Sequence, residues 1–466
     1  MKFDDNDLAY PPPSLDWDDQ VFRKIYREAE RGDPDAQFHL ARIYLDGKLL
    51  TKSSREGVRW YSFAAEQGHA GAQNNLARIF EDGDGVEKDL GKAIELYERA
   101  ANQDNDFAQY NLGRIYQNGL GVAKDLTKAF EYFLSAAKKD HMQAQLEVGL
   151  KYANGEGVEK DGAKAVEWYE KAFTNGHSHA GYLLGMRYLR GNGIEPDVNR
   201  ARNYLTKAAE SGHRLAQFAL AEQIESLSDS QENKVAAFTW FQKAAIQGLS
   251  GAQLKIGQLF LEGRGCEKSI KQAVEWLERS AEQGNVLAHV ELGDLFSKEG
   301  TELSSKEKAF SWYLKAAEKS HPHAQYLVAL MYLHGDGALK DEKNAFRWFS
   351  SATSNGHYSA PVALVECHLL GRGTEKDIAE AFRLCVEFAE RGNEIAQTRL
   401  GRMYLDGVGV PRDYVFSYAW LNIAAAAGED SAMEWRDNLE EKMTKTQIAE
   451  AQRLASRWEV GTSISR

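Results

Sequence analysis

Apolar residues recur along this chain with a period of 36 residues. The clearest marker is an alanine that returns at every thirty-sixth position in eleven units, and Ala432 continues the series. An aliphatic residue follows each alanine at the fourth position, and in most units an aromatic residue follows at the eighth. Because such spacing places side chains on one face of a helix, each unit begins with a predicted helix that has one apolar stripe. The alanines are Ala36, Ala72, Ala108, Ala144, Ala180, Ala216, Ala252, Ala288, Ala324, Ala360 and Ala396.

A second apolar stripe follows in each unit, usually after a pair of glycines. Glycines such as Gly83 and Gly85 have no Cβ and can adopt the positive φ angles that end a helix. The second stripe begins with an alanine such as Ala93, often continues with a tryptophan, and commonly closes at a glycine such as Gly68. Each unit is therefore predicted to be a helix-turn-helix. The tryptophans, which we expect to fill gaps between layers, are Trp60, Trp168, Trp240, Trp276, Trp312, Trp348 and Trp420.

A single helix pair of this kind cannot bury its apolar face, whereas stacked pairs share a continuous core. Small alanines allow neighbouring helices to approach closely. The 466 residues, enough for about three ordinary domains, are therefore predicted to form one continuous α-solenoid.

The repeated pattern resembles a known family. The segments AQYNLGRIYQNGLGVAKDLTKAFEYFLSAAKKDH (Ala108 to His141) and AQLEVGLKYANGEGVEKDGAKAVEWYEKAFTNGH (Ala144 to His177) are similar to the Sel1-like repeat, a relative of the tetratricopeptide repeat. The resemblance extends over roughly residues 36 to 457. It implies an adaptor or scaffold for protein complexes. Secreted members of one branch carry paired cysteines in their repeats, a feature that this chain lacks.

We predict an all-α fold, a right-handed α/α superhelical solenoid of about eleven 36-residue helix-turn-helix repeats with helical caps. The predicted parts are a flexible proline-containing tail (1–15), an N-terminal capping helix (16–35), the repeats (36–431), C-terminal capping helices (432–458) and a short tail (459–466). Within the C-terminal cap, residues 444–447 are predicted to form a turn and the N-cap of the last helix.

Three turns depart from the glycine-pair pattern. Residues 226–234 (SLSDSQENK) and 297–308 (SKEGTELSSKEK) are polar and lack the pair, and residues 47–57 (GKLLTKSSREG) contain apolar positions. These turns are either remodelled loops with a role of their own or the product of neutral drift in exposed positions.

Composition narrows the possible partners and compartments. The formal net charge of −12 argues against a protein that binds the phosphate backbone of nucleic acid. No apolar run approaches the roughly 20 residues that span a bilayer, and the acidic, proline-containing start does not resemble a secretory signal. Cys266, Cys367 and Cys385 are too few and too irregularly spaced for a disulfide framework. We therefore expect a cytoplasmic protein without membrane insertion.

The sequence predicts no catalytic residue, cofactor or metal site. Six histidines share one repeat position just past the second helix, and we interpret them as end-of-helix groups favoured by the helix dipole. Adjacent copies should lie about 8–10 Å apart, too far to share an ion bound at about 2.0–2.1 Å. Serine and lysine pairs such as Ser135 and Lys138 lack the companion motifs of serine hydrolases that use this spacing. The histidines are His69, His141, His177, His213, His321 and His357.

The inner surface, lined by first helices, is the candidate binding region, since related helix-pair solenoids hold extended peptides on a concave face. In the first three units, arginine and asparagine repeat there at positions that share a helix face. Stacked repeats would place these donors in a ladder that could bind carboxylates or a peptide backbone. Later units interrupt the ladder with acidic and apolar residues, and the last unit restores it. The candidate partner-binding residues are Arg42, Asn75, Arg78, Asn111, Arg114, Arg399 and Arg402.

We predict a non-enzymatic scaffold that binds a protein or peptide on this inner face. An inhibitor or immunity-type protein that sequesters one effector enzyme would use the same surface. A glycan binder would need export, and an enzyme would need a pocket of convergent polar groups. The partner and the oligomeric state are not determined by the sequence.

Overall fold

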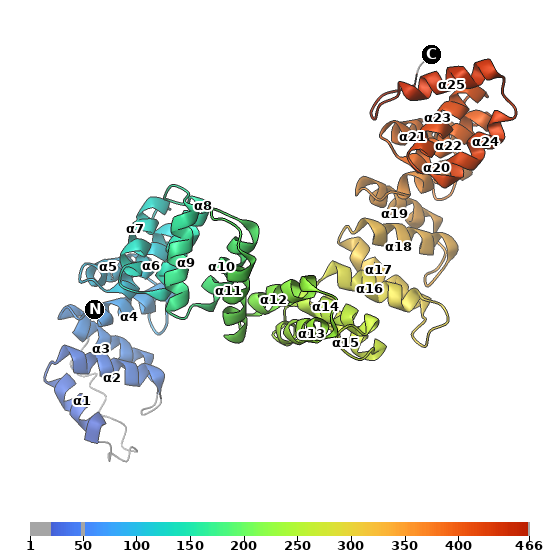
Figure 1. The fold of residues 1–466 in the computed structure, drawn as a ribbon. Coiled ribbons are helices and arrows are strands. Elements are labelled where there is room, and N and C mark those ends of the chain that lie inside the picture. The colour runs from blue at the N-terminus through green and yellow to red at the C-terminus, as the bar shows by residue number, and fades with distance from the viewer. Residues whose placement is uncertain (1–19, 48–51, 465–466) are drawn as a thin grey trace. The chain divides into compact units, whose positions relative to one another are not determined.

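The computed structural model describes residues 20–47 and 52–464, and these contain twenty-five helices and no strand. The chain divides into two compact units, one ending at Ser228 and the other beginning at Asp229. In each unit, successive helices form stacked antiparallel pairs (Figure 1). The all-α prediction is confirmed. The predicted N-terminal tail and residues 48–51 of the first variant turn lie outside the described residues.

The first unit contains α1 to α12. From α2 onward, even-numbered helices are the first helices of repeats and odd-numbered helices are the second helices. The bounds are α1 (Gln20–Glu30), α2 (Pro34–Asp46), α3 (Ser54–Glu66), α4 (Ala70–Asp82), α5 (Leu90–Ala101), α6 (Asp106–Asn118), α7 (Leu126–Ala137), α8 (Met142–Asn154), α9 (Gly162–Thr174), α10 (Ser178–Arg190), α11 (Val198–Glu210) and α12 (Arg214–Leu227).

The second unit contains α13 to α25, and the division between the units falls in the variant turn 226–234 of the sixth repeat. The bounds are α13 (Gln231–Ile246), α14 (Ser250–Glu262), α15 (Ile270–Glu282), α16 (Val286–Ser297), α17 (Lys306–Glu318), α18 (Pro322–His334), α19 (Glu342–Ser354), α20 (Ala360–Leu370), α21 (Ile378–Glu390), α22 (Glu394–Asp406), α23 (Tyr414–Ala426), α24 (Asp430–Glu440) and α25 (Lys445–Ser456).

The core of each repeat depends on close contact between its two helices. The repeat alanines are buried, and a glycine such as Gly113 often lies five residues further along the first helix. A Cβ added to Gly113 would be 2.6 Å from the ring of Phe133 on α7. The large side chain that fills the contact is thus the residue after the tryptophan position. Trp60 and Trp420 are buried, whereas the other repeated tryptophans are only half-buried.

The C-terminal cap has the predicted N-cap at Thr444, whereas the turn lies at residues 441–443 and residues 445–447 already belong to α25. Thr444 caps α25, its hydroxyl accepts a bond from the backbone N–H of Gln447, and the Gln447 side chain accepts one from the Thr444 backbone N–H. This reciprocal capping box fixes the start of α25. Beyond α25, Gly461 N–H donates to the Glu390 carbonyl at 2.6 Å, so the chain returns to α21.

A buried glutamine, the residue after the repeat alanine, ties successive helices together. Gln253 on α14 donates from Nε2 to the Ala245 carbonyl of α13, 3.2 Å away, and its Oε1 accepts a bond of 2.7 Å from Gln283 at the end of α15. The side chain thus contacts the preceding repeat and the second helix of its own repeat. Equivalent glutamines that donate to the carbonyl eight residues earlier are Gln37, Gln73, Gln109, Gln145, Gln217, Gln325 and Gln397.

The repeated histidines are placed differently from our interpretation. His69, His141, His213 and His321 are N-caps of the following first helix, where Nδ1 accepts the backbone N–H of the repeat alanine. An acceptor at a helix N-terminus must be neutral, whereas the dipole of the preceding helix would favour a cation. The interpretation of these histidines as groups at the end of the second helix, favoured by its dipole, is therefore wrong for these four.

Replacing Gln253 with alanine should weaken the second unit locally. The substitution removes two hydrogen bonds of a buried amide, at a net cost of about 0.5–1.5 kcal/mol for each, although the Ala245 carbonyl keeps the Gly248 N–H and Gln283 is exposed. Amide hydrogen exchange in α13–α15 should accelerate by roughly tenfold or more, since each 1.4 kcal/mol is a factor of ten.

Two variants control this prediction. Gln272→Ala, at an exposed position of α15, should leave exchange within about twofold. The second variant adds a partner instead of removing one. The Oε1 of Gln397 is buried without a partner, because Ala427 stands 30 positions after Gln397, where Gln283 stands after Gln253. Ala427→Gln should slow exchange in α22 and α23. Equal exchange in Gln253→Ala and the parent protein would contradict the structural role of this glutamine.

The capping histidine His213 should make the first unit sensitive to acid. Burial lowers the pKa of His213 to about 4, helped by His179, His177 and Arg214, below the ordinary value near 6.5. The folded state then binds fewer protons than the unfolded state between these values, so stability is present above pH 6.5 and is lost as the pH falls toward 4.

The measurement is the thermal unfolding midpoint, followed by circular dichroism from pH 7.5 to 4. Asparagine caps a helix without titrating, so His213→Asn should reduce the fall in midpoint across this range. An unchanged slope would show that protonation of His213 is not linked to folding.

Candidate partner-binding surface

The candidate surface consists of the residues three and six positions after each repeat alanine, which we call the first-helix face. In the first unit, these positions follow one another along α2, α4 and α6. Arg42 and Arg78 are exposed, and neither forms an ion pair with any residue in the described ranges. They are the two predicted arginines whose charge remains available to a partner.

The predicted asparagines have partners within the protein. Asn75 Nδ2 donates to the Tyr61 hydroxyl at 3.0 Å, and Asn111 Nδ2 donates to Asn74 Oδ1 at 3.1 Å. The Tyr61 pKa is raised, chiefly by burial. The first bond joins α4 to α3 and the second joins α6 to α4, so both asparagines contribute to the packing of these helices.

Arg114 belongs to a polar network that crosses the repeat boundary. Its Nη1 donates to Asn111 Oδ1 at 3.2 Å, and its Nη2 lies 3.4 Å from Glu81 Oε1. Glu81 is buried and also accepts a bond of 2.9 Å from the Tyr97 hydroxyl. Burial and then the Glu81 charge raise the Tyr97 pKa well above its usual range. Arg114 therefore neutralises a buried carboxylate, although its side chain is 40% exposed.

The middle of the first unit differs in character. Glu147 on α8 is half-buried and its pKa is raised by that burial, whereas neighbouring Leu150 is apolar. Lys151 is buried and pairs with Glu156 at 2.7 Å. The predicted interruption of the basic ladder is thus present at α8.

The two predicted arginines of the last repeat are engaged with neighbouring repeats. Arg399 Nη2 lies 3.2 Å from Glu366 Oε1, and the Arg402 guanidinium lies over the Trp435 ring with its Cζ 4.5 Å from the centroid. A guanidinium over an aromatic face is attracted by the ring quadrupole. Neither side chain is a free donor of the kind that the ladder hypothesis requires.

These contacts share a spacing that sequence reasoning missed. Each of four cross-repeat pairs joins residues 33 positions apart, and the pairs are Glu81 with Arg114, Gln258 with Glu291, Glu366 with Arg399, and Arg402 with Trp435. A search for complementary side chains at this separation could have found them. Arg42 and Arg78 stay unpaired because the asparagines 33 positions later bond elsewhere.

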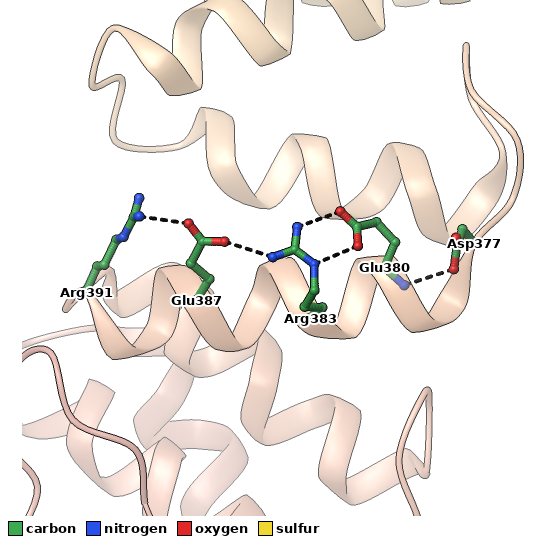
Figure 2. Close-up of polar contacts among 5 residues, drawn as sticks. All are labelled: Asp377, Glu380, Arg383, Glu387 and Arg391. Carbon is green, nitrogen blue, oxygen red and sulfur yellow. Dashed lines mark hydrogen bonds and ion pairs between the residues drawn. The ribbon is translucent and has the colours of Figure 1, made fainter.

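Exposed charges on a second helix can be compensated within that helix, as α21 demonstrates (Figure 2). Arg383 binds Glu380 at 2.7 Å through Nε and Glu387 at 3.2 Å, and Arg391 binds Glu387 at 2.8 Å. The Asp377 N-cap precedes this row. The Arg383 bonds lower the pKa of Glu380. This row leaves little net charge to attract a partner, unlike Arg42 and Arg78.

The histidine clusters provide no ligand set. His213 Nε2 lies 3.1 Å from His179 Nδ1 and, because His213 Nδ1 accepts from Ala216 N–H, Nε2 must carry the proton and donate. In the described ranges, no group of three or more histidine, cysteine, aspartate or glutamate residues is placed to hold a metal ion. Within the same residues, no helix is long and apolar enough to span a membrane.

The matches between this chain and known proteins lie in its repeats. The Sel1 repeat family matches residues 34–69, 70–105, 106–141, 143–177, 178–213, 214–249, 250–285, 286–321, 322–357, 362–393 and 395–429. The crystal structure of c5321, a protective antigen present in uropathogenic Escherichia coli strains displaying an SLR fold, is 32% identical, with 94% of each chain covered and a TM-score of 0.71. A Sel1 repeat protein from Oxalobacter formigenes is 26% identical, with 56% of this chain and 96% of that chain covered and a TM-score of 0.42.

No curated protein matches the chain. The predicted family and the solenoid fold are nevertheless confirmed by the eleven matched repeats and by the similarity to c5321. The chain belongs to the Sel1 repeat family.

Proposed function

We propose that the protein is a non-catalytic interaction scaffold, and that the first-helix face of repeats one to three binds an acidic segment of a protein partner. Sel1 repeat solenoids typically serve as protein-interaction scaffolds. The observation that carries the proposal is the exposure of Arg42 and Arg78, which form no ion pair with the described residues and lie on successive first helices.

The chemistry of these side chains favours carboxylates. A guanidinium offers two parallel donors that match a carboxylate, and such charge-assisted bonds are stronger than neutral ones. Packed helices lie about 8–10 Å apart, so two arginines on successive first helices could bind carboxylates on one extended segment. Arg114, partly exposed beside Glu81, would extend the same row.

Affinity would come from many modest contacts, with a few arginine anchors contributing most of it. We further propose a reducing compartment such as the cytoplasm. The thiols of Cys266, Cys367 and Cys385 are free, and burial raises the pKa of Cys367 to about 11. A buried thiol with a raised pKa reacts slowly because the thiolate is the nucleophile.

Replacing Arg42 and Arg78 together with alanine should weaken capture of acidic partners. Loss of two partly exposed charge-assisted bonds should reduce affinity by about tenfold or more, and capture from native extract, quantified by mass spectrometry, should fall accordingly. The effect should shrink as salt is raised, because exposed charges are screened.

Arg347→Ala is the matched control, since Arg347 is exposed on a second helix and forms no ion pair with the described residues. A fluorescent peptide of alternating aspartate and glycine, titrated against each variant by anisotropy, provides a defined probe. Equal capture and equal anisotropy for the double variant and the control would overturn the proposal. Capture of one enzyme in a one-to-one complex would instead favour the inhibitor alternative.

A further inference from the structure

The turn between the two helices of an ordinary repeat packs against the start of the preceding second helix. The second glycine of the pair makes this contact. A Cβ added to Gly337 would be 2.0 Å from the Lys306 carbonyl oxygen, and one added to Gly373 would be 1.8 Å from that of Glu342. Only glycine allows this approach, so the turn contacts the backbone of the first residue of the neighbouring helix.

The eighth repeat cannot make this contact. Thr301 stands 36 residues after Gly265, where the second glycine would be, and Glu299 replaces the first glycine. Lys298, directly after α16, leaves the helix in an extended conformation with φ −71° and ψ 108°. The helix start that the turn would have contacted is Ile270 of α15, which is 44% exposed, compared with 39% for Ile378, which the turn at Gly409 contacts.

A pocket of about 710 Å³ occupies this place in the second unit. Its volume lies within the range of roughly 300–1,000 Å³ typical of small-molecule sites. Leu303 of the variant turn packs against the buried core of this repeat. This contact holds the turn in place as one wall of the pocket. The aliphatic lining residues are Leu261, Ile270, Val274, Leu295 and Leu303.

Lysines predominate among the charged residues of the pocket. Lys268, Lys271 and Lys298 line it, together with Glu275 and Glu302. The three lysines are exposed, and none of them forms an ion pair with another residue of the described ranges. This excess of positive charge contrasts with the net charge of −12 of the whole chain. An aliphatic wall edged by unpaired ammonium groups is complementary to an alkyl chain that ends in a negative charge.

We propose that this pocket binds a linear aliphatic carboxylate, a fatty acid. The alkyl chain would lie against the aliphatic wall and the carboxylate would face the lysines. A peptide is disfavoured because its backbone amides would lose water against a wall of aliphatic side chains without gaining hydrogen-bond partners there. The pocket is separate from Arg42 and Arg78, so the inference does not rest on the proposed function.

The test is calorimetric titration of the full chain with dodecanoate below its critical micelle concentration, beside dodecyltrimethylammonium as a probe of equal chain length and opposite charge. We expect one dodecanoate per chain and at least tenfold weaker binding of the cation. The variant that replaces Lys268, Lys271 and Lys298 with glutamine should lose about tenfold or more in dodecanoate affinity.

A second variant, Glu299→Gly with Thr301→Gly, restores the glycine pair and should close the pocket and abolish binding. Circular dichroism establishes that each variant is folded, and the lysine variant keeps the test decisive should the glycine variant not fold. No binding of dodecanoate, equal binding of the two probes, or unchanged binding in a folded variant would overturn the proposal. Tighter binding of an acidic leucine-ended peptide than of dodecanoate would overturn it as well.

Discussion

In eight of the eleven repeats, a buried glutamine after the repeat alanine fixes one repeat against the next, and the stacking of those repeats depends on it. A solenoid repeat contacts only its neighbours, so the same contact can be applied again at one boundary after another. A buried amide must find partners for its donor and its acceptor. Gln253 finds them on the preceding second helix and on its own second helix. Gln37, Gln73, Gln145 and Gln325 also make both bonds, whereas Gln397 in the last repeat makes only the donor bond. The angular and axial offset between layers is restricted by these two bonds.

Because the offset between successive repeats is constant, residues at a fixed separation in the sequence lie next to each other in space. The residue before the repeat alanine contacts the N-cap residue of the next first helix, which lies 34 positions later in the sequence. Examples are the contacts of Asp35 with His69 and of His179 with His213. The first-helix face uses a separation of 33, as Glu366 and Arg399 show. A residue on this face is available to a partner only when the residue at that separation is not complementary to it. The binding surface therefore consists of the side chains on this face that have no partner on a neighbouring repeat.

Sequence periodicity predicted the helix pairs, the glycine turns and the Thr444 cap because each depends on local preferences of the chain. The role of the histidines was predicted wrongly because a residue just past a second helix also lies just before the next first helix. The sequence pattern does not show which of the two helices the side chain caps. His141 caps the following helix. The ladder residues Arg399 and Arg402 were predicted as free donors because their partners, Glu366 and Trp435, lie on neighbouring repeats. Those pairings become visible only when the offset between repeats is known.

Departures from the repeat can create new surface because the array is one-dimensional. Loss of the glycine pair in the eighth repeat removes one turn contact, while the alanine core of that repeat, with Ala288 and Ala309, remains buried. The change is therefore confined to a turn and the start of one helix. Leu303 fills part of the space and joins the core, whereas Ile270 is left exposed at the edge of the pocket. Residues that recur in every repeat are committed to stacking, and a site for a ligand is most easily formed where one repeat no longer makes a contact that its neighbours make.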